Sequence, residues 1–181
     1  MINKQCKPTF TNPNGFNPKW WGSHFWRILH EIAWHFPITT TDRFCSTQNQ
    51  EIRLQYKQFY KALASVLPCY ICCKHYNDYI TKGSRKCILN DDVFENRQTL
   101  TTWLFNIHNC VNKGLKKKLD YTKYSQITNL YKNKNYWNRY GNKVIYYVLW
   151  NYPIINKKNW RNSIKKKKDY IIFFYKFKIC N

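Results

Sequence analysis

Apolar side chains recur every three or four residues in three separate segments, and this spacing limits the fold more than any other feature. The segments are residues 20–36, 52–66 and 95–117, and Pro37 ends the first of them. A period of about 3.6 residues is typical of amphipathic helices that turn one face to a shared core. The expected inward residues are Trp26, Leu29, Ala33 and Phe36 in the first segment, Ile52, Tyr56, Phe59, Leu63 and Val66 in the second, and Leu100, Trp103, Leu104, Ile107, Val111 and Leu115 in the last.

Two further helices complete the expected bundle. Pro68 suits the first position of a helix, because its missing N–H costs nothing there, and this third helix should end near Gly83. Asp120 is a suitable N-cap for a short helix that follows. The sequence therefore predicts an all-α fold, a four-helix bundle with a short fifth helix.

Composition divides the chain into three parts. Residues 1–18 are rich in Asn and Pro, and we expect a flexible N-terminal arm there. Residues 19–132 form the predicted domain, and residues 133–181 are a basic, aromatic-rich C-terminal extension whose fold the sequence does not indicate. Hydrophobic residues make up 44% of the chain, which is enough to bury a core.

The chain is strongly basic, with 31 Lys and Arg against 9 Asp and Glu and a formal net charge of +22. Such a surface attracts polyanions, so the extension is a candidate for polyanion binding. A drift of composition towards Lys, Asn, Ile and Tyr explains the charge equally well. The N-terminus lacks the apolar core of a signal peptide, and no apolar run is long enough to span a bilayer. We therefore expect a cytoplasmic protein with no membrane span.

Residues 68–76 carry the strongest chemical signal. Cys69 and Cys72 form a Cys-x-x-Cys pair, and His75 follows three residues later. The positive end of a helix dipole favours a thiolate, and two thiols one turn apart can alternate between dithiol and disulfide. A zinc site would need a second Cys/His pair at a suitable spacing, and a thioredoxin-like motif would need βαβ surroundings. We therefore expect a redox pair in a helix bundle and no metal site.

Three blocks of residues follow one another in a specific order. They are Trp21-Gly22-x-x-x-Trp26-x-x-Leu29-His30-x-x-Ala33-x-x-Phe36-Pro37, then Pro68-Cys69-x-x-Cys72-x-x-His75-Tyr76, then Trp103-x-x-x-x-His108-Asn109-x-Val111-Asn112-x-x-Leu115-x-Lys117. Over roughly residues 19–132 this arrangement resembles the Erv/ALR family of FAD-linked sulfhydryl oxidases, especially the single-domain forms encoded by large cytoplasmic DNA viruses.

The resemblance implies a thiol oxidase that forms disulfides in protein substrates. Electrons would pass from dithiols through Cys69 and Cys72 to FAD and then to O2, giving hydrogen peroxide. In the family the second cysteine of the pair faces the flavin, so Cys72 would be the flavin-side thiolate and Cys69 would exchange with the substrate. The implied FAD-binding residues are Gly22, Trp26, His30, His75, His108, Val111, Asn112 and Lys117.

The side chains at these positions suit the parts of FAD. An isoalloxazine ring needs a flat apolar slot, which Trp26 and neighbouring aromatic residues can supply. An adenine needs stacking and edge hydrogen bonds, which His30, His108 and Asn112 offer, and a pyrophosphate needs cations such as Lys117. The cofactor would carry the electron chemistry while the protein orients it.

The resemblance also implies a homodimer and an electron donor, either a thiol-containing protein substrate or a thioredoxin-like protein. The setting would be the host cytoplasm, and the virion if the protein is viral. Family members relay electrons through a second disulfide, for which Cys6, Cys45, Cys87 and Cys180 are the candidates. The pairing of these residues and of Cys73 and Cys110 cannot be chosen from the sequence.

Some positions depart from the family pattern. Ser23 stands where members often have Arg, and Phe105 and about Thr122 stand where many cellular members have a structural disulfide. Cys73, directly after Cys72, is either a buried bystander or an alternative redox partner. Two other functions stay open, a basic nucleic-acid-binding protein and a redox-inactive interaction module.

Overall fold

Along its described residues the chain forms two very short strands, four α-helices and one 3₁₀ helix. The computed structural model describes residues 11–12, 15–39, 47–117, 125–126 and 129. Of the fifth helix expected after Asp120, only residues 125, 126 and 129 belong to the described part of the chain. The extension over residues 133–181 lies entirely outside that part, as do Cys6, Cys45 and Cys180.

The chain enters the bundle through a small antiparallel strand pair. β1 (Thr11–Asn12) pairs with β2 (Gly15–Phe16), within the segment that the sequence predicts as a flexible arm. α1 (Pro18–Trp34) follows almost at once, because Asn17 accepts a hydrogen bond from the N–H of Lys19 at 3.1 Å and Pro18 stands in the first turn. The helix therefore begins two residues earlier than its apolar period suggests.

The start of α3 also differs from the expectation. α2 (Thr47–Val66) is followed by α3 (Tyr70–Lys82), and Pro68 does not occupy the first position of that helix. Cys69 is the N-cap, with an extended backbone and a sulfur that accepts from the N–H of Cys72 at 3.2 Å. This bond satisfies one of the N–H groups that a helix start leaves without a partner inside the helix. Pro68 therefore belongs to the connection from α2.

The polar connection after α3 contains a further short helix. η1 (Asp91–Phe94) is a 3₁₀ helix that buries two apolar side chains. α4 (Arg97–Gly114) then begins with a capping box, in which Asn96 accepts from the N–H of Thr99 and the side chain of Thr99 accepts from the N–H of Asn96. The sequence pattern locates α4 well but places its start at residue 95.

The end of α4 corrects one predicted core residue. Leu115 is expected to face inward, but it follows the last helical turn and is 54% exposed. Lys116 has a φ of 53°, a left-handed backbone conformation that commonly ends a helix. Because α4 ends at Gly114, Leu115 is no longer part of the helix and does not share the inward face of its apolar residues.

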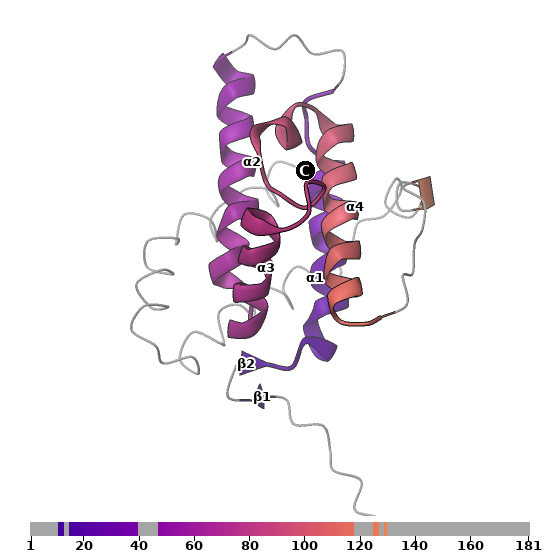
Figure 1. Cartoon of the computed structure of the whole chain (residues 1–181). Helices are drawn as coiled ribbons and strands as arrows, with labels where there is room; N and C mark the ends of the chain where they lie inside the picture. The colour runs from indigo at the N-terminus through magenta and orange to yellow at the C-terminus, as the bar shows by residue number, and fades with distance from the viewer. Residues whose placement is uncertain (1–10, 13–14, 40–46, 118–124, 127–128, 130–181) are drawn as a thin grey trace, which may run out of the picture.

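The helices form two packed pairs (Figure 1). α1 lies beside α4, and α2 lies beside α3. The start of α1 and the end of α4 meet near the strand pair, whereas η1 packs on α2 and α4 at the opposite end. None of the helices in the described part of the chain has the length and apolar character needed to cross a membrane.

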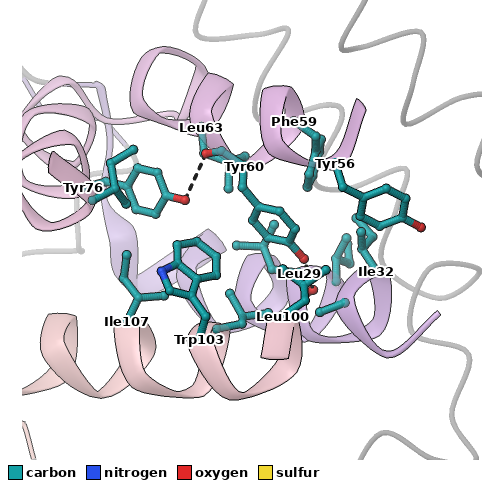
Figure 2. Close-up of a cluster of buried hydrophobic side chains, with 14 of the residues drawn as sticks. Leu29, Ile32, Tyr56, Phe59, Tyr60, Leu63, Tyr76, Leu100, Trp103 and Ile107 are labelled. Carbon is teal, nitrogen blue, oxygen red and sulfur yellow. Dashed lines mark hydrogen bonds between the residues drawn. The ribbon is translucent and has the colours of Figure 1, made fainter. Parts of the chain in front are cut away.

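Aromatic side chains fill the core between the helix pairs (Figure 2). Tyr60 of α2 is completely buried, and its ring meets that of Trp103 edge-on at 5.3 Å between centroids. Its hydroxyl donates to the carbonyl of Leu29 in α1 at 3.0 Å, and the hydroxyl of Tyr76 in α3 donates to the carbonyl of Tyr60 at 3.0 Å. Burial raises the pKa of Tyr60 and of Tyr76, so both hydroxyls keep the proton that they donate.

A disulfide ties the connection after α3 to α4. Cys87 is completely buried and is bonded to Cys110, and the indole N–H of Trp103 donates to the carbonyl of Cys87 at 3.2 Å. The sequence leaves the partners of both cysteines open and counts Cys87 among the candidates for an electron relay. The structure instead buries Cys87 within a crosslink between two parts of the fold.

We predict that breaking the Cys87–Cys110 bond destabilises the protein. Cys87→Ala, Cys110→Ala and the double variant should each lose about 3 kcal/mol of unfolding free energy, because each opens the same crosslink across a sequence separation of 23 residues. Urea unfolding followed by circular dichroism measures the loss. The two single variants break the same bond, so the double variant should lose no more unfolding free energy than either of them. A loss in the double variant equal to the sum of the two single losses would contradict the pairing.

Candidate active site

The Cys-x-x-Cys pair lies at the N-terminus of α3 as a disulfide between Cys69 and Cys72. Cys69 is 4% exposed, and Cys72 is partly buried. Cys73 takes no part in either disulfide of the described chain; its buried thiol donates to the carbonyl of Leu67 at 3.4 Å. Among the described residues, no three His, Cys, Asp or Glu side chains gather as metal ligands.

A cavity of about 800 Å³ opens on one side of this disulfide. It lies at the end of the bundle where α1 begins, α2 and α4 end, and α3 passes (Figure 1). Cys72 lines the cavity and Cys69 does not. We call Cys72 the inner sulfur because it borders the cavity, whereas Cys69 belongs to the buried core cluster. The apolar lining consists of Trp21, Phe25, Trp26, Leu29, Leu63, Leu67, Tyr76, Tyr79, Val111 and Leu115.

Three rings from α1 and α4 meet at the wall of the cavity. Trp26 and His108 are stacked, with ring centroids 4.0 Å apart and an interplanar angle of 10°. Behind them, Nε2 of His30 lies 3.2 Å from Nδ1 of His108, so one ring donates a hydrogen bond to the other. His30 is 2% exposed and does not itself line the cavity. The arrangement gives the cavity a flat wall that a third, buried ring holds in place.

Both imidazoles are neutral at neutral pH. Burial, together with the nearby charge of Lys117, lowers the pKa of His108 to about 4. Burial and the neighbouring His108 lower the pKa of His30 well below its ordinary value. A neutral pair suits the hydrogen bond, because one ring nitrogen must accept the proton that the other donates.

The end of α4 carries a cation to the mouth of the cavity. The left-handed backbone at Lys116 turns the chain, and the N–H of Lys117 then donates to the carbonyl of Asn112 at 2.9 Å. Just before this turn, the hydroxyl of Tyr79 in α3 lies so close to Gly114 that a Cβ there would force the tyrosine side chain to move. Because of the turn, Lys117 lines the cavity.

The structure gathers nearly all of the predicted site residues around one space. Gly22, Trp26, Cys72, His75, His108, Val111, Asn112 and Lys117 all line the cavity. A Cβ at Gly22 would meet nothing within 4 Å, so this glycine adds open space to the wall. Two predicted residues do not line the cavity: Cys69 is bonded to Cys72, and His30 is hydrogen-bonded to His108.

Sequence reasoning missed other parts of the lining. Trp21 and Phe25 lie one helical turn apart on α1. On α3, Tyr76 lies one turn and Tyr79 two turns beyond Cys72. Helical spacing was therefore a signal that could have found these four residues. Lys19 and Arg27 add cations to the lining. No sequence signal separates these two from the many other basic residues of this chain.

We predict that the histidine pair makes stability depend on pH. Between about pH 6.5 and about pH 4 the unfolded chain binds protons that the buried pair does not, so the unfolding free energy should fall as the pH falls through this range. His108→Asn removes one of these groups and should make the fall shallower. Urea unfolding at a series of pH values tests this, and equal slopes for the two proteins would refute it.

The sequence matches known proteins over the same region. The model of the Erv1/Alr family matches residues 23–137. A protein of Acanthamoeba polyphaga mimivirus named probable FAD-linked sulfhydryl oxidase is 33% identical over 57% of this chain and 64% of its own length. The mitochondrial FAD-linked sulfhydryl oxidase of Saccharomyces cerevisiae is 32% identical over 53% of this chain and 43% of its own length. The chain thus spans less than two thirds of either relative.

Viral and structural relatives agree with this match. The FAD-linked sulfhydryl oxidase of African swine fever virus is 31% identical over 61% of this chain and 79% of its own length. The crystal structure of the yeast Erv1 core superposes with a TM-score of 0.50 at 23% identity, over 74% of this chain and 99% of that chain, which shows a common fold. Because the family model extends over more than half of the sequence, including all of α2, α3 and α4, the chain belongs to the Erv1/Alr family.

Proposed function

We propose that this chain is an FAD-linked sulfhydryl oxidase that forms disulfides in protein substrates. The observation that carries the proposal is the position of the Cys69–Cys72 disulfide at the wall of the cavity. Cys72 lines a space with aromatic walls, and its disulfide partner Cys69 does not border that space. A disulfide placed in this way can accept electrons at one sulfur and release them at the other.

The residues of the cavity fit FAD. Its volume of about 800 Å³ lies within the range of about 300–1,000 Å³ that is usual for cofactor sites. Trp26 and its apolar neighbours offer flat contacts to a ring system, His108 and Asn112 offer stacking and hydrogen bonds, and Lys117 offers charge to a pyrophosphate. Bound FAD would supply the acceptor for the electron pair of the Cys69–Cys72 dithiol and would deliver the pair to O2, giving hydrogen peroxide.

The protein's own part is thiol–disulfide exchange. A substrate thiolate attacks the sulfur of Cys69, the Cys69–Cys72 bond breaks, and Cys72 leaves as a thiolate beside the cavity. A second substrate thiolate then attacks the substrate sulfur of the mixed disulfide and releases Cys69. The substrate has lost two electrons and two protons and has gained a disulfide, and the cysteine pair holds the electrons. The dipole at the N-terminus of α3 favours both thiolates, and the N–H of Cys72 donates to the sulfur of Cys69.

Other parts of the proposal rest on the family or on the sequence alone. The family implies a homodimer and a thiol-containing protein or thioredoxin-like donor. The sequence motivates a cytoplasmic location and, through its basic charge, polyanion binding by residues 133–181. The domain boundaries after residues 18 and 132 also stay predictions. The described residues do not favour a nucleic-acid-binding function, because the segment that motivated it lies outside them.

We predict that Cys69→Ser and Cys72→Ser each abolish dithiol oxidation while FAD stays bound. Either substitution removes the disulfide that the substrate attacks but leaves the aromatic wall of the cavity intact. Oxygen consumption with dithiothreitol and the flavin absorbance spectrum measure the two properties. Turnover that persists in both variants would rule out this pair as the reactive disulfide.

Cys73→Ser is the matched control for these two variants. Cys73 is the neighbouring cysteine, it is buried, and a serine hydroxyl can also donate to the carbonyl of Leu67. We expect this variant to turn over like the parent. If it is inactive although folded and flavin-bound, Cys73 takes part in the exchange and the two-cysteine scheme is incomplete.

We predict that Trp26→Ala weakens FAD binding by about tenfold to hundredfold, since loss of one stacking aromatic commonly changes affinity by about this factor. Titration of the flavin-free protein with FAD, followed by fluorescence, gives the affinity. Trp20→Ala makes the same substitution in the same helix at a residue that does not line the cavity, and it should bind FAD like the parent. Equal losses in both variants would argue against Trp26 as a cofactor contact.

A further inference from the structure

Two large apolar side chains are exposed between the redox cysteines. Tyr70 is 42% exposed and Ile71 is 41% exposed, and both stand in the first turn of α3. Among the described residues, three other large hydrophobic residues are exposed, Trp20, Leu54 and Leu115, and Leu115 lines the cavity. Two of these five exposed side chains therefore lie between the redox cysteines.

Tyr70 and Ile71 lie at the start of α3 but outside the packed core. The first turn of α3 contains no acidic residue, although Asp or Glu there would interact favourably with the helix dipole. Neither Tyr70 nor Ile71 belongs to the core cluster or to the packed layer around it. Exposed apolar side chains that adjoin a reactive centre are typical of a surface that contacts a partner.

The position of Cys69 brings a polypeptide substrate into contact with this pair. Cys69 does not border the cavity and is 4% exposed, so an attacking thiol must reach past the residues that flank it. Pro68 on one side is buried, whereas Tyr70 and Ile71 on the other side are exposed. The residues next to the substrate's cysteine therefore come to lie against these two side chains.

We infer that Tyr70 and Ile71 select protein segments in which an apolar residue adjoins the reactive cysteine. This inference rests on the proposed function and adds a class of substrate to it. An apolar side chain beside the attacking cysteine leaves water when it packs on Tyr70 and Ile71, whereas a small dithiol has no such group. Lys74, one turn further along α3, is exposed and bounds the apolar surface with a charge.

The test compares two synthetic dithiol peptides with the full chain in its flavin-bound form. The peptides have equal length and charge and differ only in having Phe or Ser beside each cysteine. We expect the parent to oxidise the Phe peptide with a kcat/KM about tenfold higher than that of the Ser peptide. In the Tyr70→Ser/Ile71→Ser variant this ratio should fall to about one, mainly through a higher KM for the Phe peptide.

Matched variants keep the experiment interpretable. Leu54→Ser makes the same type of substitution at a residue of α2 that is 53% exposed, and it should keep the preference of the parent. Tyr70→Phe and Ile71→Leu keep an apolar side chain at each position and should also keep it. The flavin absorbance of each variant reports that the cavity has formed.

The outcomes separate this inference from the proposed function. A parent that oxidises dithiothreitol but treats the two peptides alike overturns the role of Tyr70 and Ile71 and leaves the oxidase intact. A preference that survives in the double variant, or that is lost equally in Leu54→Ser, overturns it as well. A parent that oxidises neither the peptides nor dithiothreitol refutes the oxidase itself.

Discussion

The bundle depends on buried aromatic side chains whose polar atoms donate to backbone carbonyls of neighbouring elements. Tyr60 of α2 donates to Leu29 of α1, Tyr76 of α3 donates to α2, and Trp103 of α4 donates to the connection that carries Cys87. Each ring contributes apolar contact. Its hydrogen bond to one particular carbonyl can form only when the neighbouring element has one position along the helix axis. These bonds set the register of the helices, which apolar packing alone leaves less defined.

The active site follows from this register. Tyr76 binds to α2 and also lines the cavity one turn after Cys72, so the bond that positions α3 also positions the inner sulfur. On the other side of the cavity, the buried His30 holds His108 against Trp26. The site is thus assembled from the ends of helices whose middle parts are locked together in the core. Tyr70 and Ile71, the proposed substrate contacts, stand between the two cysteines of the same disulfide and are exposed.

Much of the fold was predictable because the helices are strongly amphipathic. The apolar stripes of α1, α2 and α4 are confirmed at Leu29, Phe59 and Leu104, which are all buried. The errors lie at helix ends, where a local hydrogen bond competes with the period. The sulfur of Cys69 caps α3, so that helix begins at Tyr70 and not at Pro68. The left-handed backbone at Lys116 ends the helical turn of α4, so Leu115 does not continue its apolar stripe. Such contacts involve single groups and leave no repeating signal.

The sequence by itself determined that the chain forms an amphipathic helical bundle with a redox-capable cysteine pair, because spacing and residue chemistry are local properties. The flavin site was implied by the resemblance of three residue blocks to a family. Only the tertiary structure decided that Cys87 pairs with Cys110 and that the buried His30 contacts His108 without lining the cavity. Each of these depends on how segments far apart in the chain are rotated and aligned when they pack. That alignment is a property of the whole core and is encoded in no single stretch.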